Sequence, residues 1–179
     1  MRLDRSGSAH RNCSASGVFI CWQGEIIVNF SISMADSGDA GDILALQKVA
    51  YQSEATLYQN WTIPPLMQTL SEIEAEFGTG IFLKAILEGR IVGSVRGSLR
   101  SGKCLIGRLI VYPHYQGKGI GTALMKSLEK AFPEADRFEP FTGNKSMNNI
   151  RLYERLGYEA YREEDLSLDV RLVFMEKQR

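Results

Sequence analysis

Residues 109–122 read Leu109-Ile-Val-Tyr-Pro-His-Tyr-Gln-Gly-Lys-Gly-Ile-Gly-Thr122, and this stretch decides how the rest of the chain is interpreted. Its apolar beginning is typical of a strand, and its end leads directly into an amphipathic helix. Between them, Gly117, Gly119 and Gly121 let backbone N–H groups approach an anion with no Cβ in the way. A helix N-terminus adds about half a positive charge, so the stretch predicts a pyrophosphate site.

Two common phosphate-binding motifs are absent, because the chain has neither G-x-x-x-x-G-K-[ST] nor a G-x-G-x-x-G after its first strand. The pattern that does occur, V-x-P-x-x-Q-G-x-G-x-G, runs from Val111 to Gly121. It resembles motif A of the Gcn5-related N-acetyltransferase (GNAT) family, whose Q/R-x-x-G-x-G/A loop holds the pyrophosphate of acetyl-coenzyme A. A second segment, I-R-L-Y-E-R-L-G-Y from Ile150 to Tyr158, resembles the family's x-L-Y-E-x-x-G-F/Y motif. The resemblance extends over roughly residues 27–176.

The resemblance implies that acetyl-coenzyme A is a co-substrate and that a primary amine attacks its thioester directly, through a tetrahedral intermediate. The backbone N–H groups of residues 109–111 would then stabilise the oxyanion. The implied cofactor-binding residues lie in the strand, the glycine loop, the first helical turn and the next helix: Leu109, Ile110, Val111, Gln116, Gly117, Lys118, Gly119, Ile120, Gly121, Thr122, Ser146, Asn149 and Tyr153.

Ser146 marks a departure from the family pattern, since many members carry an asparagine seven residues before the tyrosine. Here Asn149 stands four residues before Tyr153 instead. The three residues share one helix face, so either polar side chain could reach the cofactor. The alternative interpretation makes Ser146 the N-cap of the helix, with Asn149 in its first turn.

The resemblance assigns protonation of the leaving thiolate to Tyr153, which could also be a half-buried aromatic that anchors its helix. The general base is less defined, because the strand over residues 104–111 lacks the glutamate that many relatives have there. Glu139 and Glu54 are the candidates, and each could instead be a surface group or an ion-pair partner. His114 is expected to be an exposed turn residue, and with only one other histidine, His10, the chain shows no metal site.

The remaining pattern predicts an α+β fold. Strands are expected over residues 26–33, 81–87, 91–100, 104–111, 137–141, 158–162 and 168–176, and helices over 40–51, 64–77, 119–132 and 146–156. A linker that contains Tyr51, Tyr58 and Trp61 would join the first two helices. This order predicts a GNAT-like mixed, mostly antiparallel central sheet of about six to seven strands, flanked by about four helices.

Composition excludes several other classes of protein. Of 179 residues, 21 are Lys or Arg and 21 are Asp or Glu, so no excess positive charge favours nucleic acid. Three scattered cysteines fit reduced thiols, and the longest apolar run near the N-terminus, residues 18–22, is too short for a signal peptide or a membrane span. We therefore expect a cytoplasmic protein without membrane or nucleic-acid partners.

We expect two regions, a poorly specified tail over residues 1–25 and an acetyltransferase domain over 26–179. Residues 18–22 could instead add an edge strand. Two functions remain open: an N-acetyltransferase, or a catalytically idle acyl-coenzyme A-binding module for regulation or protein interaction. The acceptor amine is also open, because Tyr51, Tyr58, Trp61 and Glu54 would suit a cationic amine but could equally be core residues. A homodimer is left open as well.

Overall fold

A computed structural model describes residues 18–19, 29–166 and 170–179. Its strands form one sheet in the order β1-β2-β3-β4-β5-β6-β8-β7. The strands are β1 (Val18–Phe19), β2 (Phe30–Met34), β3 (Ile81–Leu87), β4 (Arg90–Arg100), β5 (Lys103–Val111), β6 (Arg137–Gly143), β7 (Glu159–Asp165) and β8 (Arg171–Gln178). The helices are α1 (Ala40–Ala50), α2 (Gln52–Tyr58), α3 (Pro64–Met67), α4 (Leu70–Phe77), α5 (Ile120–Ala131) and α6 (Met147–Arg155), with short 3-10 turns at η1 (Ser37–Asp39) and η2 (Pro113–Tyr115).

The mixed, mostly antiparallel sheet that the sequence predicts is confirmed. Every neighbouring pair of described strands is antiparallel except β5 and β6, which are parallel. Helix α5 is the crossover between these two strands, as a parallel connection requires.

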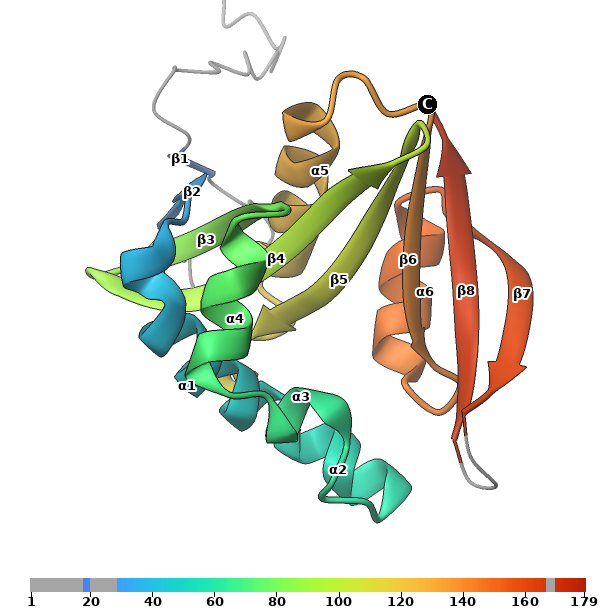
Figure 1. Cartoon of the computed structure of the whole chain (residues 1–179), viewed down its shortest axis with the longest axis horizontal. Helices are drawn as coiled ribbons and strands as arrows, with labels where there is room; N and C mark the ends of the chain where they lie inside the picture. The colour runs from blue at the N-terminus through green and yellow to red at the C-terminus, as the bar shows by residue number, and fades with distance from the viewer. Residues whose placement is uncertain (1–17, 20–28, 167–169) are drawn as a thin grey trace, which may run out of the picture.

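The parallel pair β5 and β6 does not stay together along its length. The ladder joins residues 103–106 to residues 137–140, and the two strands then diverge toward their C-terminal ends (Figure 1). Strand β5 is also bulged: its register against β4 shifts between Ser94 and Arg96, and Arg108 has φ of 49°. A bulge twists and bends its strand locally. The last residues of β5 are thus paired to β4 but free on their β6 side.

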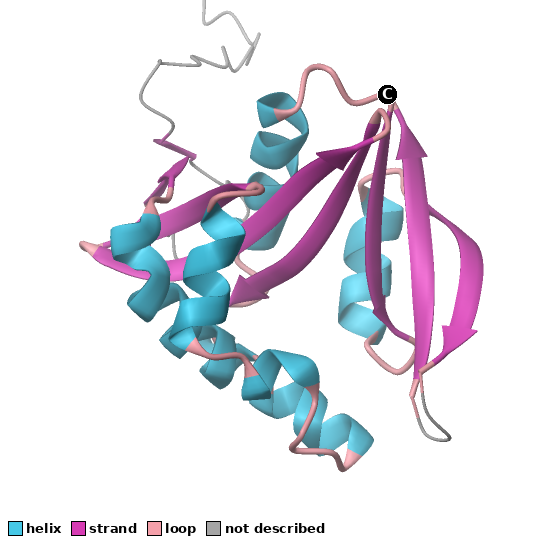
Figure 2. Cartoon of the chain, viewed as in Figure 1, coloured by secondary structure: helices cyan, strands magenta, loops and turns pink. Residues whose placement is uncertain are grey.

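Helices cover both faces of the sheet, with α1 and α4 on one face and α5 and α6 on the other (Figure 2). On the α5 side, Leu124 and Leu128 are fully buried in a core that includes Tyr153 of α6. On the other side, Ile43 of α1 and Ile73 of α4 bury against the sheet in a second core. Burial of this apolar surface is the main force that holds the helices in place.

Two glycines of β4 let α5 lie close to the sheet. A Cβ at Gly93 would lie 3.0 Å from side-chain atoms of Ile120 and Leu124, and one at Gly97 would lie 2.9 Å from the ring of Phe132. Larger residues there would push the helix away. The glycines therefore also fix the position of the loop from which α5 begins.

The structure differs from the sequence prediction in the segment between residues 51 and 77. The linker contains the helix α2, and the helix expected over 64–77 is two helices, α3 and α4. Thr69 begins α4 with a capping box, in which its side chain accepts from the N–H of Glu72 and the Glu72 carboxylate accepts from the N–H of Thr69. Gln68, at the break, is buried and receives a hydrogen bond from Gln47 of α1.

At the N-terminal edge, Val18 pairs with Ser31 and Phe19 with Phe30, so two residues of the expected tail do form an edge strand. The other residues of the tail, and residues 26–28 of the first expected strand, lie outside the described residues. In the part of the chain that is described, no helix is long and apolar enough to cross a membrane.

Candidate active site

The glycine loop joins the free end of β5 to the N-terminus of α5. Gly117 and Gly119 have φ of 75° and 80°, a left-handed conformation that glycine adopts without strain. The first hydrogen bond of α5 runs from the N–H of Ala123 to the carbonyl of Gly119, at 3.0 Å. The backbone N–H groups of residues 117–122 donate a hydrogen bond to none of the described residues. They form a row of free donors at a helix N-terminus, which suits an anion.

Gly121 has a different role from the other two glycines. It lies within the helix, and a Cβ there would lie 3.3 Å from Cδ2 of Leu152 in α6 and 3.9 Å from Val111. Its lack of a side chain thus lets α5 pack against α6 and β5. Gln116 closes the loop by donating from Nε2 to the carbonyl of Val111 at 3.2 Å.

Tyr153 of α6 is buried, with 4% of its surface exposed. Its ring lies 5.9 Å from the ring of Tyr158, and its hydroxyl bonds to none of the described residues. Burial raises the pKa of Tyr153, and the nearby carboxylate of Glu54 raises it further because its negative charge opposes a second one. The hydroxyl therefore keeps its proton at neutral pH and is free to donate it.

Glu54 of α2 reaches α6 through a hydrogen bond. The buried hydroxyl of Ser146 donates to Oε2 of Glu54 at 2.5 Å, across 92 residues of sequence. Ser146 stands at the N-cap position of α6, but its side chain makes no capping hydrogen bond. The side chain thus links α2 to α6, which the sequence interpretation did not include.

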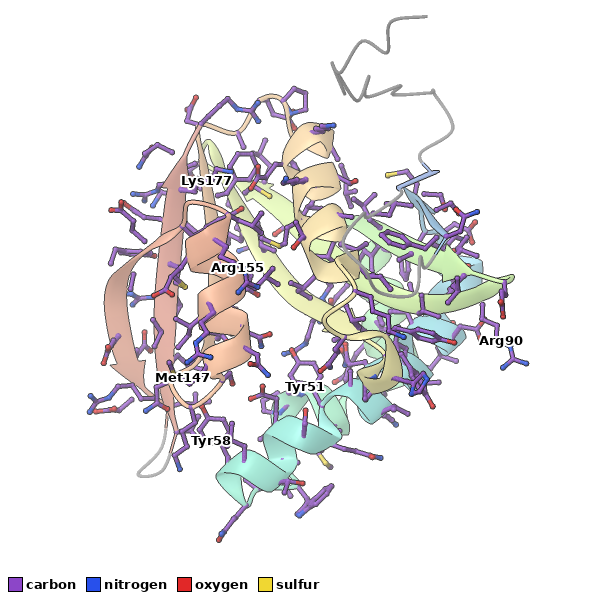
Figure 3. All side chains as sticks on the ribbon, turned by 180° about the vertical axis from the view of Figure 1, so that it is seen from behind. Tyr51, Tyr58, Arg90, Met147, Arg155 and Lys177 are labelled. Atoms are coloured by element: carbon purple, nitrogen blue, oxygen red, sulfur yellow. The ribbon has the colours of Figure 1, made fainter. Side chains whose placement is uncertain are left out.

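Tyr58 ties α2 to the same region. Its hydroxyl accepts from the N–H of Lys145 at 2.8 Å, just before α6. Figure 3 shows Tyr58 beside Met147, the first residue of α6, with Tyr51 nearby. Of the three aromatic residues in this region, Tyr58 is buried, whereas Trp61 is 59% exposed and lies at the surface.

Asn149, the other polar candidate on α6, donates from Nδ2 to the hydroxyl of Thr142 at 3.3 Å. Lys118 of the glycine loop places its ammonium 5.3 Å from the centre of the Tyr115 ring.

Glu139 lies in a separate group of charges. Its carboxylate is 2.6 Å from Arg137 and 3.2 Å from Lys103, and 11% of the side chain is exposed. It lines a pocket of about 460 Å³ whose walls come from α4, β3, β4, β5, β6, β7 and β8, and no residue of α6 is among them. The structure therefore brings Glu54 near Tyr153, whereas the carboxylate of Glu139 contacts the cations Arg137 and Lys103.

Arg108, which the sequence interpretation missed, faces Tyr51. Its guanidinium carbon lies 5.8 Å from the centre of the Tyr51 ring. Burial raises the pKa of Tyr51, and the positive charge of Arg108 partly opposes this. The available signal was an arginine in the otherwise apolar run L-I-G-R-L-I-V, directly after a glycine.

Among the described residues, no group of three or more His, Cys, Asp or Glu side chains is arranged to hold a metal ion.

Comparison with known proteins agrees with this geometry. Residues 45–158 match the model of the acetyltransferase (GNAT) family. The uncharacterized N-acetyltransferase MJ1530 of Methanocaldococcus jannaschii is 35% identical over 80 residues, which cover 43% of this chain and 51% of that protein. The chain spans from about a quarter to about half the length of the curated relatives it matches.

Two solved structures share the fold at low identity. The PaiA N-acetyltransferase from Thermoplasma acidophilum, solved in complex with coenzyme A, aligns with a TM-score of 0.70 and 16% identity, over 84% of this chain and 99% of that one. The yncA protein of Salmonella typhimurium, solved with acetyl-CoA, aligns with a TM-score of 0.65 and 20% identity, over 84% and 94% of the two chains. Since the family model matches well over half of the residues, and includes both the glycine loop and Tyr153, the chain belongs to the acetyltransferase (GNAT) family.

Proposed function

We propose that this chain is an acetyl-coenzyme A-dependent N-acetyltransferase that transfers the acetyl group to a primary amine. The observation that carries this proposal is the row of free N–H groups over residues 117–122, directly after the strand end that diverges from β6. The PaiA and yncA structures, which were solved with coenzyme A and acetyl-CoA, support it.

The pyrophosphate of acetyl-coenzyme A would accept from the N–H groups at Gly117, Gly119 and the first turn of α5. The free edge at Leu109, Ile110 and Val111 would bind the pantetheine arm as an added strand. Its N–H groups would also stabilise the oxyanion. This loop and first turn also contain Gln116, Lys118, Ile120, Gly121 and Thr122. Ser146 lies at the N-cap position of α6 and Asn149 lies within the helix.

In the reaction, the ammonium of the acceptor first loses a proton, for which Glu54 is the better placed base. The free amine then attacks the carbonyl carbon, so that a C–N bond forms and the carbonyl oxygen becomes an oxyanion. Collapse of this tetrahedral species breaks the C–S bond, and Tyr153 donates its proton to the thiolate. The proton that the attacking nitrogen loses as the amide forms restores the Tyr153 hydroxyl. The raised pKa of Tyr153 means that the proton is present when the thiolate needs it.

The test is to incubate the purified chain with acetyl-coenzyme A and a panel of primary amines and to measure free thiol. Amine-dependent thiol release, together with acetylated product by mass spectrometry, is the expected result. Calorimetric binding of acetyl-coenzyme A without thiol release from any amine would instead identify an idle acyl-coenzyme A-binding module. No binding at all would contradict the proposed site.

A further inference from the structure

We propose that the acceptor amine also carries an anionic group, a carboxylate or a phosphate, and that Arg108 and Arg96 bind this group beside Tyr51. The inference rests on the proposed function and names the substrate class of the same site.

Arg108 is a cation without a matching anion. The bulge in β5 places it at the strand end that diverges from β6, against the ring of Tyr51. Its Nε is enclosed and bonds to no described residue, and no described carboxylate forms an ion pair with it. A guanidinium in a partly enclosed site needs a counter-charge or hydrogen-bond acceptors to offset lost hydration.

Arg96 is a second cation in the same place. It stands opposite Gly107 in the β4–β5 ladder, one residue before Arg108, and only 13% of its side chain is exposed. Burial lowers the pKa of Arg96 to about 10, with Glu76 opposing this shift and the like charge of Arg108 adding to it. Two guanidinium groups thus act on each other inside the protein.

The nearby carboxylates contact Arg96 but not Arg108. Glu76 lies 2.8 Å from Arg96 and also accepts from Gln68 at 2.6 Å. Glu54 accepts from Ser146 rather than from Arg108. Among the described residues, Arg108 therefore has no carboxylate in ion-pair contact, whereas Arg96 has one.

The order of charges around Tyr51 matches a substrate with an amine at one end and an anion at the other. The charges of Arg108 and Arg96 act on Tyr51, and so does Glu54, which also acts on Tyr153. A cationic amine beside Glu54 would lie near the proposed acid, and an anionic group would meet the arginines. Of the two arginines, Arg96 lines the pocket of about 460 Å³, as does Gly107, the residue before Arg108.

Guanidinium groups bind carboxylates and phosphates by paired, charge-assisted hydrogen bonds, so the same pair of arginines would accept either. Three amines that share an aminoethyl group distinguish a carboxylate from a phosphate as the anionic group of the acceptor. β-Alanine has a carboxylate, phosphoethanolamine has a phosphate, and propylamine has neither. Longer ω-amino acids, paired with alkylamines of equal length, extend the series.

The experiment measures kcat/KM of the full chain for these amines, by thiol release from acetyl-coenzyme A. For at least one anion-bearing amine, kcat/KM is expected to be about 10-fold or more above that of its uncharged counterpart. Arg108→Met should remove most of this preference and leave the uncharged amine little affected. Arg108→Lys should keep part of it, because the charge remains but the planar pair of donors is lost.

Arg90→Met is the matched control, since Arg90 is the exposed first residue of β4 and lies on the side of the molecule away from Tyr58 in Figure 3. Arg90→Met should keep the wild-type preference for anion-bearing amines over uncharged amines. Melting temperatures confirm that each variant is folded. Equal turnover of charged and uncharged amines, or an equal loss for both in Arg108→Met, would overturn the inference.

Failure of the proposed function has a different signature, because no amine of any class would then release thiol. In that case calorimetry with β-alanine and phosphoethanolamine, in the presence of coenzyme A, still decides the inference. Binding that Arg108→Met weakens about 10-fold or more would support an anion site. Absence of binding, or binding that Arg108→Met leaves unchanged, would overturn it.

Discussion

At the scale of single residues, Tyr153 combines burial with an unbonded hydroxyl. Tyr153→Phe keeps the ring contact with Tyr158 and removes only the hydroxyl. If Tyr153 protonates the thiolate, kcat should fall by about 100-fold or more, while the melting temperature changes little. Steady-state kinetics and thermal unfolding of the variant check this. A folded variant with wild-type turnover would leave Tyr153 with a packing role only.

The raised pKa of Tyr153 gives a pH prediction. A proton donor must be protonated to act, so activity is lost as pH rises through its pKa. Since the pKa of Tyr153 lies above the usual tyrosine value of about 10, kcat should show no alkaline fall below about pH 10. A fall with a lower midpoint that disappears in Tyr153→Phe would mean that the tyrosine loses its proton more easily than its surroundings indicate.

Glu54 and Glu139 are distinguished by their neighbours. Glu54→Gln removes a base beside Tyr153, so the rate should drop most near neutral pH and recover at high pH, where the free amine is already abundant. Glu139→Gln leaves that site intact and weakens the contacts with Arg137 and Lys103, so its pH–rate profile should match the wild type. The reverse pattern in the two profiles would make Glu139 the base and Glu54 a binding group.

At the scale of elements, the loop before α5 depends on backbone conformation. Gly119 has φ of 80°, where a Cβ is strained, so Gly119→Ala should distort the row of N–H donors and weaken acetyl-coenzyme A binding severalfold or more. Gly41→Ala in α1 is the control, since its Cβ would meet no atom within 4 Å and should stabilise the helix by about 0.5–1 kcal/mol. Calorimetry on both variants is the measurement. Equal affinity in folded Gly119→Ala would contradict the pyrophosphate site.

At the scale of the whole molecule, the described part of the N-terminal region is the two-residue strand β1. Of the described residues before β2, only Val18 and Phe19 pair with it, and they form the edge strand farthest in order from β6. The sequence of residues 1–25 has no regular apolar stripe. Removing residues 1–25 should therefore leave the melting temperature and acetyl-coenzyme A affinity nearly unchanged. A large loss of stability on thermal unfolding would show that this region covers apolar surface.

The features that the sequence by itself determined are local or periodic. Residues 109–122 predict a strand, a glycine loop and a helix because the conformation of glycine and the spacing of apolar residues depend on few neighbours. The antiparallel strands after residue 81 follow from short turns, and the parallel pair follows from a helical crossover. The break before α4 was also readable, since Thr69 and Glu72 have the spacing of a capping box.

Other features were decided only by the tertiary structure, because they join residues that are distant in sequence. The bond between Glu54 and Ser146 depends on how α2 packs below the divergent strands, and no spacing in the chain encodes it. The contact of Arg108 with Tyr51 depends on a bulge whose register is set by β4. Packing of whole elements, rather than local preference, selects among such contacts, which is why the sequence pointed to the loop and to Tyr153 but left the base and the acceptor open.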